Sequence, residues 1–385
     1  MGIVCFPGLG GSSVVAAELA EGMAARGHEV HLISRARPFR STSSTSTSSS
    51  GGGLGRVHFH KVPMPDYPVL DHAPYTVALA STLIEIGRAH GLQLLHVHYA
   101  VPHAAAGYLA RQALGTRGPK LVTTLHGTDV TRLGSDPAYR AATAFTLTAS
   151  DGVTVPSAFL REEARHRLGL PADMAIEVIP NFVDTERFRP AAARDPSRLH
   201  ALFGGGEGPV LFHVSNFRAV KRPGDLVEVL SRVRRHVPAR LVLVGDGPER
   251  DETEARARDL EVDAHLRFLG RRDDFVDLLQ HADAFLLPSE TESFGVAALE
   301  SLSAGVPVVG YRVGGLPEVV CEGVGRLVAP FDLDALADAV LELVTKPNVR
   351  DALAQKARAH AVASFQLQPA LDRYESYFQR VLSHS

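Results

Sequence analysis

Residues 284–300, Ala-Phe-Leu-Leu-Pro-Ser-Glu-Thr-Glu-Ser-Phe-Gly-Val-Ala-Ala-Leu-Glu, decide the fold of this chain. The apolar run at 284–287 predicts a buried strand, and the periodic residues that follow predict a helix. A helix that begins directly after a buried strand presents free backbone N–H groups and the positive end of its dipole. The backbones of Ser293, Phe294 and Gly295 can therefore bind an anion such as a diphosphate.

This predicted helix carries two carboxylates, Glu292 at its start and Glu300 two turns later. Positions eight apart stay roughly on one helix face, about 80° past two full turns at ~100° per residue. Both side chains can therefore border one site. The alternative is a glutamate that pairs with the helix dipole and a second, solvated glutamate, and for an isolated pair at this spacing that alternative is the better one. The rest of the chain argues against it.

Strand and helix patterns alternate along the whole chain, which predicts an α/β protein with doubly wound parallel sheets. One alternation fills residues 1–190 and a second fills 191–363, with a Gly-rich stretch at 204–206 after the boundary. Residues 364–385 are amphipathic and predict a C-terminal helix that packs back on the first domain. The Ser/Thr/Gly run at 41–53 has no apolar residues, so we expect a disordered loop there.

Composition excludes several classes of protein. Of 385 residues, 45% are hydrophobic and 22% charged, and the net charge is −3, so no basic field attracts nucleic acid or anionic membrane. No apolar run approaches the ~18 residues of a membrane span. The chain starts on a strand pattern rather than a signal peptide, and its two cysteines, Cys5 and Cys321, lie among apolar residues. We therefore expect a cytoplasmic protein with both cysteines reduced and in the core. The sequence leaves open whether the chain forms a homodimer.

Polar loops follow the predicted strands, where open α/β sheets place their ligands. In the first half, a glycine turn with Gly10 and Gly11 precedes a helix, and later loops carry Tyr99 and His126-Gly-Thr-Asp129. In the second half, Ser215-Asn-Phe-Arg-Ala-Val-Lys-Arg222 places three cations within five residues. That loop is either a solvated basic loop or a clamp on phosphate or carboxylate.

In combination, these motifs resemble the retaining glycosyltransferases of family four. They are Gly10-Gly11, His126-Gly127, Asn216 with Lys221, Val244-Gly-Asp-Gly-Pro248 and the Glu292/Glu300 helix. The resemblance covers nearly the whole chain and implies the GT-B fold, two Rossmann-like domains facing a central cleft that holds a nucleotide-sugar. The insert at 41–53 is not a feature of the family.

Further stretches are similar to the branch of that family that serves bacillithiol biosynthesis: residues 96–103, 123–129, 133–137, 181–184 and 213–222. This likeness implies transfer of N-acetylglucosamine from UDP-N-acetylglucosamine to the hydroxyl of L-malate, with an α-linked product and no metal. Many family members carry Arg at the position of Asn216, and this branch has its arginine at 218 instead.

The resemblance also implies roles for single residues. Glu300 would bind the ribose of UDP, and Lys221 and Arg222 would neutralise the diphosphate together with backbone near Gly10, Gly11, Ser293, Phe294 and Gly295. Asn216 would join the donor site. Glu292 and His126 would contact the sugar and the reacting centre, with Lys221 as the third catalytic group. Contacts to the acceptor would come from Ser12, Tyr99, Thr128 and Arg218.

Three other patterns suggest metal sites. Asp332-Leu-Asp334 precedes a predicted helix and is best explained as a helix cap. His58-x-His60 and His96-x-His98 each place two imidazoles on one strand face, but the sequence shows no third ligand for zinc. We therefore expect these histidines to have roles in the cleft or in the core, and we expect no bound metal.

Three other functions compete with this interpretation. An NAD-dependent dehydrogenase would need an acidic residue after the second strand, where the chain has Ser34-Arg-Ala-Arg37. An NADP-dependent enzyme could use these arginines, but it would leave the second half of the chain unexplained. A non-catalytic sugar-nucleotide sensor would not need Glu292, Glu300, Lys221 and His126 together. A family-four enzyme acting on inositol phosphate or a cell-envelope acceptor is the closest competitor, because loops set acceptor choice.

Overall fold

The computed structural model describes residues 1–8, 10–38, 56–64 and 73–383. The expected loop at 41–53 lies outside these residues. The described chain divides into two compact units. The first unit comprises Met1–Asn181 and Gln368–Ser385, and the second comprises Phe182–Leu367.

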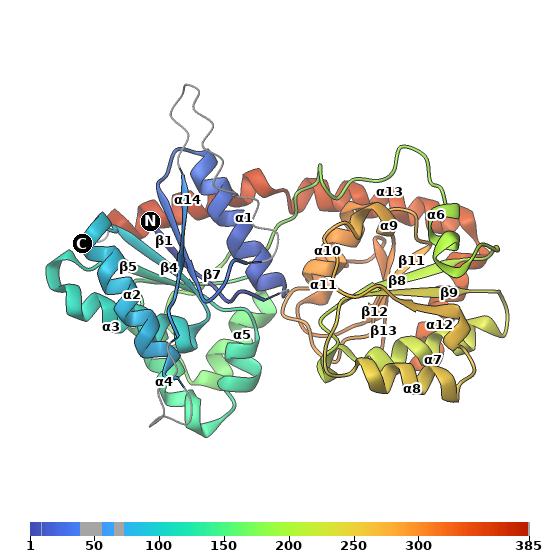
Figure 1. The fold of residues 1–385 in the computed structure, drawn as a ribbon, viewed down its shortest axis with the longest axis horizontal. Coiled ribbons are helices and arrows are strands. Elements are labelled where there is room, and N and C mark those ends of the chain that lie inside the picture. Colours follow the sequence, from blue (N-terminus) through green and yellow to red (C-terminus); the bar gives the residue numbers. More distant parts are fainter. Residues whose placement is uncertain (9, 39–55, 65–72, 384–385) are drawn as a thin grey trace. The chain divides into compact units, whose positions relative to one another are not determined.

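A parallel sheet of seven strands forms the centre of the first unit, with helices on its faces (Figure 1). The strands in spatial order are β3 (Val57–Lys61), β2 (Val30–Ser34), β1 (Gly2–Val4), β4 (Leu94–His98), β5 (Lys120–Thr124), β6 (Gly152–Val155) and β7 (Glu177–Val178). The helices are α1 (Gly11–Ala25), α2 (Tyr75–His90), α3 (Ala105–Leu114), α4 (Pro137–Thr148), α5 (Ala158–Leu168) and α14 (Leu367–Ser383).

A parallel sheet of six strands forms the centre of the second unit. Its strands in spatial order are β10 (Leu266–Phe268), β9 (Arg240–Val244), β8 (Val210–Val214), β11 (Ala284–Leu287), β12 (Val308–Tyr311) and β13 (Gly325–Val328). Its helices are α6 (Ser197–His200), α7 (Pro223–Arg234), α8 (Arg250–Asp259), α9 (Val276–Leu279), α10 (Val296–Ser303), α11 (Leu316–Val319), α12 (Leu333–Thr345) and α13 (Pro347–Ser364). The doubly wound α/β architecture predicted from the sequence is confirmed.

Both faces of the second sheet are covered. Val210 and Phe212 of β8 belong to one apolar cluster, and Leu211 between them belongs to another. Since successive side chains of a strand point to opposite faces, the two clusters lie on the two sides of the sheet. This burial explains why the strands read as continuous apolar runs rather than as alternating patterns.

The division of the chain falls before the Gly-rich stretch at 204–206. Residues 182–190, which the sequence assigns to the first domain, belong to the second unit, because Val183 and Phe188 are buried in its core. The backbone N–H of Val183 also donates to the carbonyl of Phe365 at 2.9 Å. The Gly-rich stretch is therefore a loop inside the second unit.

The C-terminal helix α14 packs on the first unit along its apolar side. Leu371 lies so close to Gly22 of α1 that a Cβ at Gly22 would meet the Leu371 side chain. The Tyr377 hydroxyl donates to the Val153 carbonyl at 3.3 Å. Arg26 of α1 forms ion pairs with Asp372 and Glu375 at 2.7 and 3.0 Å. Apolar contacts and charges thus attach α14 to the same unit.

Three local predictions need comment. The helix expected from residue 101 begins at Ala105, because Val101, which precedes Pro102, is extended (φ −118°, ψ 128°) and a wider π-type turn, Ala100–Ala104, precedes the helix. Asp332 caps α12 as predicted, accepting from the N–H of Ala335 at 2.9 Å. Cys5 is buried, but Cys321 is exposed in the turn after α11, so its assignment to the core is wrong.

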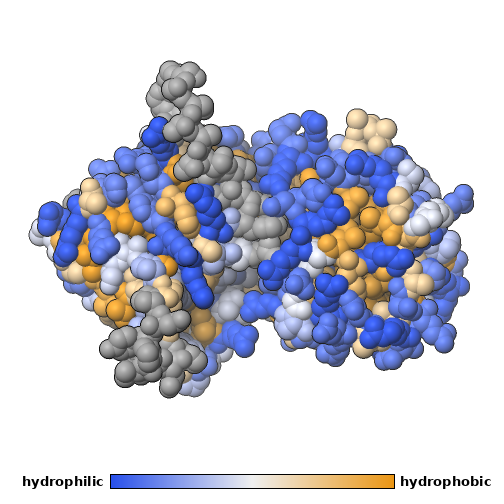
Figure 2. Space-filling model, in the orientation of Figure 1, coloured by the Kyte–Doolittle hydropathy of each residue, from blue (hydrophilic) through white to orange (hydrophobic). Residues whose placement is uncertain are grey.

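The hydropathy of the surface is that of an ordinary globular protein, as the composition predicts. Figure 2 shows mostly hydrophilic side chains on this face, with smaller apolar areas among them. Among the described residues, no helix combines the length and the apolar character that crossing a membrane would need.

Candidate active site

In the second unit, the predicted donor residues lie in the loops after β8 and β11 and at the start of α10. The carboxyl ends of parallel strands share one edge of a sheet, so these loops are neighbours. The N–H of Glu290 donates to the carbonyl of Val220 at 2.9 Å, which joins the β8 loop to the β11 loop. Residues far apart in the sequence are thereby brought together.

An ion pair between Lys221 and Glu292 connects the two loops. The Lys221 Nζ lies 2.6 Å from the Glu292 Oε1, and the Ser289 hydroxyl donates to the same oxygen at 2.8 Å. Glu292 is only 9% exposed, and these two donors hold its carboxylate in place. An ammonium carries three N–H donors, so Lys221 can keep this bond and still donate to a bound anion.

Arg222 is engaged differently from Lys221. It makes a two-pronged ion pair with Asp225 at 2.7 and 2.9 Å, and Asp225 also accepts from the Tyr311 hydroxyl at 2.8 Å. The hydrogen bond to Asp225 raises the pKa of Arg222. The guanidinium also lies 4.8 Å from the ring centre of Phe331. Both cations are therefore paired with carboxylates, Arg222 through two hydrogen bonds and Lys221 through one.

The Asn216 loop is pressed against the glycine turn after β9. A Cβ at Gly247 would collide with the Asn216 carbonyl oxygen, and the N–H of Glu249 donates to the Phe217 carbonyl at 2.9 Å. The Asn216 Oδ1 atom is buried and has no hydrogen-bond partner within the described parts of the chain. A buried amide oxygen without a partner is costly, which is consistent with a ligand that donates to it. Arg218, two residues on, is exposed.

The start of α10 has the backbone shape that an anion site needs. Gly295 precedes the helix with φ +99°, a conformation that side chains disfavour. The Phe294 side chain is 3% exposed and belongs to the core, where its ring centre lies 5.6 Å from that of Phe365. Only the backbone of Phe294 is therefore available to a ligand. Ser293 stands next to it, and Glu300 is 5% exposed further along the helix.

In the first unit, Ser12 and Tyr99 meet at the carboxyl edge of the sheet. Their hydroxyl oxygens lie 2.9 Å apart. Ser12 is in the first turn of α1, which Gly10 and Gly11 open, and Tyr99 follows β4 with φ +88°. This places two predicted acceptor residues side by side.

His126 lies beside Tyr99, with ring centres 5.3 Å apart, and Thr128 follows it in the same loop. The Nε2 of His126 is 2.7 Å from the Nδ1 of His98, and the two imidazole rings are stacked. Burial lowers the pKa of His126 to about 3, so the ring is neutral at pH 7. A neutral imidazole can donate or accept a hydrogen bond near the sugar but brings no charge to the diphosphate.

The sequence placed two further groups, His98 and Asp129, at the ligand edge of the sheet but assigned neither of them to the donor or acceptor site. His98 is buried beneath His126 and fixes its ring, and Asp129 accepts from the His126 N–H at 2.7 Å. Burial raises the pKa of Asp129 to about 7. Their positions at the end of β4 and in the loop after β5 were the available signal, since polar residues there belong to the ligand edge of the sheet.

The two histidine pairs have different surroundings. His96 is bonded to the Thr124 hydroxyl at 2.6 Å and His98 to His126, which explains that pair without a metal. His58 and His60 lie beside His31 and His90. Neighbouring imidazoles for this pair are thus supplied by His31 of β2 and His90 at the end of α2.

Comparison with known proteins gives two family matches. Residues 9–187 match the model described as Glycosyltransferase Family 4, and residues 203–360 match the model described as Glycosyl transferases group 1. The chain is 39% identical to the N-acetyl-alpha-D-glucosaminyl L-malate synthase of Bacillus anthracis, over 99% of this chain and 97% of that protein. It is 30% identical to the D-inositol 3-phosphate glycosyltransferase of Saccharomonospora viridis, over 91% of this chain and 85% of that one.

Among solved structures, Anabaena HepE in complex with UDP and glucose superposes with a TM-score of 0.77 at 19% identity, covering 98% of each chain. At this identity the likeness concerns the fold alone. Together with the two parallel sheets, it shows the GT-B fold that the resemblance implied.

Proposed function

Because the chain belongs to glycosyltransferase family 4, and is therefore a sugar-transferring enzyme, we propose that it moves N-acetylglucosamine from UDP-N-acetylglucosamine to the hydroxyl of L-malate. The products would be UDP and N-acetyl-α-D-glucosaminyl L-malate, and the reaction would be the first step of bacillithiol biosynthesis. The observation that carries the choice of substrates is the 39% identity over 99% of the chain.

On this proposal, the second unit holds the donor. The Glu300 carboxylate would bind the vicinal hydroxyls of the ribose. Lys221 and the backbone N–H groups at the start of α10 would bind the diphosphate, with Asn216 and Arg222 completing the pocket. Stabilising the charge that develops on the leaving group is usually the largest electrostatic contribution to such a reaction.

The acceptor would meet hydroxyls and one cation. Malate has two carboxylates, and Ser12, Tyr99, Thr128 and Arg218 offer the donors that carboxylates need. The malate oxygen would form a bond to the anomeric carbon on the face from which the diphosphate departs. The C–O bond to the phosphate would break, and the leaving phosphate oxygen would take the hydroxyl proton.

His126 and Glu292 would act on the sugar. His126, neutral and held by His98, would hydrogen-bond near the 6-hydroxyl, and Glu292 would bind sugar hydroxyls while its charge faces the transition state. No step of this scheme uses a metal ion, because Lys221 and the helix N-terminus supply the positive potential.

Product analysis with an acceptor panel tests the substrates. We would incubate the enzyme with UDP-N-acetylglucosamine and L-malate, D-malate, inositol phosphate or no acceptor. The proposal predicts one product, from L-malate, with an α-linkage by NMR. Product from inositol phosphate instead would leave the family assignment intact and contradict the choice of malate.

A further inference from the structure

Four histidines and a glutamate gather around β2, β3 and the end of α2, three of them at the start of these strands and His60 further along β3. We call this group, Glu29, His31, His58, His60 and His90, the edge cluster. His31 pairs with His58 across the two strands. The ring of His31 lies 5.1 Å from those of His58 and His60 and 4.3 Å from that of His90.

The ligand atoms of this cluster converge. Glu29, His31 and His90 each offer one atom, and the three atoms lie within 4.8 Å of one another. The Glu29 Oε1 is 3.6 Å from the Nε2 of His31 and 3.6 Å from the Nε2 of His58. In a tetrahedral zinc site with bonds of about 2.0–2.1 Å, ligand atoms stand roughly 3.4 Å apart. Binding would therefore draw the atoms of Glu29, His31 and His90 closer together, and the Nε2 of His58 would approach from beside Glu29.

The other nitrogen of His31 is already fixed. Its Nδ1 lies 2.9 Å from the Nε2 of His60. When His31 donates from Nδ1, its Nε2 carries the lone pair and faces Glu29. Metal-binding histidines are typically oriented in this way, by a hydrogen bond from the nitrogen that does not bind the metal.

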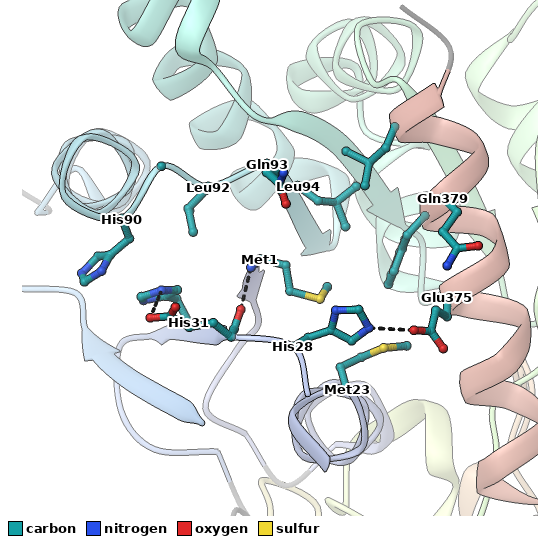
Figure 3. Close-up of a pocket in the computed structure, with 14 residues that line it drawn as sticks. Met1, Met23, His28, His31, His90, Leu92, Gln93, Leu94, Glu375 and Gln379 are labelled. Atoms are coloured by element: carbon teal, nitrogen blue, oxygen red, sulfur yellow. Dashed lines mark hydrogen bonds and ion pairs between the residues drawn. The ribbon is translucent and has the colours of Figure 1, made fainter. Parts of the chain in front are cut away.

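Three members of the edge cluster, Glu29, His31 and His90, line a cavity of about 240 Å³ (Figure 3). Glu29 and His90 are exposed and His31 is 1% exposed, so the group is buried on one side and accessible on the other.

We propose that Glu29, His31, His58 and His90 bind a divalent transition-metal ion, with His60 orienting His31. Three imidazoles and one carboxylate are a ligand set that suits zinc among the common metals. The bound ion would tie β2, β3 and the end of α2 together. The edge cluster lies at the amino ends of the strands, whereas Tyr99 and His126 lie at their carboxyl ends, so this proposal is independent of the proposed reaction.

Calorimetric titration of zinc chloride into the full-length chain, free of any affinity tag and of prior metal, tests the proposal. We expect one zinc ion per chain. Glu29→Gln and His90→Ala each change an exposed side chain, so both variants should fold. Each should weaken binding by at least about tenfold.

Two matched controls accompany these variants. His166→Ala removes an exposed histidine at the end of α5. His28→Ala removes a histidine that lines the same cavity but whose Nε2 is hydrogen-bonded to the Glu375 Oε1 at 2.8 Å. Both should bind zinc as the unmodified chain does. Zinc should also raise the unfolding temperature of the controls but not of the two ligand variants. Failure of the unmodified chain to bind stoichiometric zinc, or binding that survives both ligand variants, would overturn the proposal.

Discussion

Lys221 and Glu292 are separated by 71 positions in the sequence, yet their charged atoms are 2.6 Å apart. Each was predicted separately, Lys221 from a cationic loop and Glu292 from a helix start. Their contact could not be predicted, because spacing in the chain does not reveal which strands are neighbours. The contact between His98 and the His126 ring could not be predicted for the same reason, since His126 lies in the loop after the adjacent strand β5.

Replacement of Lys221 by alanine should lower kcat by about 10²–10³, the usual effect of losing one preorganised charge contact to a leaving group. Steady-state rates of UDP release measure this. Lys356→Ala, an exposed lysine of α13, is the matched control and should leave kcat unchanged. A Lys221→Ala enzyme with the kcat of the control would contradict the assigned role.

Gly247→Ala should disturb the donor loop without touching any predicted ligand side chain. Its Cβ would collide with the Asn216 carbonyl, so we expect a loss of about 1–3 kcal/mol in stability and weaker UDP binding. Thermal unfolding and calorimetry with UDP measure the two effects.

The control for this variant is Gly224→Ala, at the start of α7, where a new Cβ meets no atom within 4 Å. It should bind UDP normally and be up to about 1 kcal/mol more stable. Equal UDP binding by the two alanine variants would show that the Asn216 loop does not shape the donor site.

At the scale of elements, helix and strand patterns were sufficient to predict the doubly wound α/β fold. The boundary between the two units depends on tertiary packing, which these patterns do not show. The spacing of apolar residues predicted the C-terminal helix. It could not show that residues 182–190 pack into the second core, because Val183 and Phe188 look like any other apolar positions in the sequence. The Gly-rich stretch at 204–206 was the more visible signal, but it marks only a loop.

Leu371→Ala should destabilise the first unit by about 2–5 kcal/mol, since this fully buried side chain of α14 packs against α1 at Gly22. Urea unfolding followed by circular dichroism measures the change. Leu382→Ala on the same helix removes a side chain that is 39% exposed and should cost less than about 1 kcal/mol. Similar losses for both variants would mean that α14 is not anchored through Leu371.

At the scale of the whole molecule, the two units differ in buried histidines. Burial lowers the pKa of His96 and His126 to about 3, that of His103 to about 4, and that of His98 well below its ordinary value, all in the first unit. In the second unit, burial lowers the pKa of His213 to about 4. These rings are neutral in the folded state at pH values where the unfolded chain already binds protons.

The first unit should therefore be the more acid-labile of the two. Above the ordinary pKa of 6.5 these histidines cost nothing, and below it each favours the unfolded chain by up to about 1.4 kcal/mol per pH unit. Asp129 acts in the opposite direction. Its raised pKa of about 7 makes its contribution more favourable as the pH falls from 7 toward 3.8, which offsets one histidine.

Hydrogen exchange at pH 7.5 and 5.0, corrected for the intrinsic rates, tests this difference. Peptides from β4–β6 should lose more protection at pH 5.0 than peptides from β8, β9 and β11. Equal losses in both sets, or a larger loss in the second set, would contradict the expected order.

The most direct test of the central claim is the release of UDP from UDP-N-acetylglucosamine, measured with and without L-malate in the presence of EDTA. The account predicts release that depends on L-malate, that persists when divalent metals are chelated, and that falls sharply in Lys221→Ala. Metal-independent release that no acceptor accelerates would contradict the malate assignment. No release with any acceptor, together with no binding of UDP, would contradict the donor site built from Lys221, Glu292 and the start of α10.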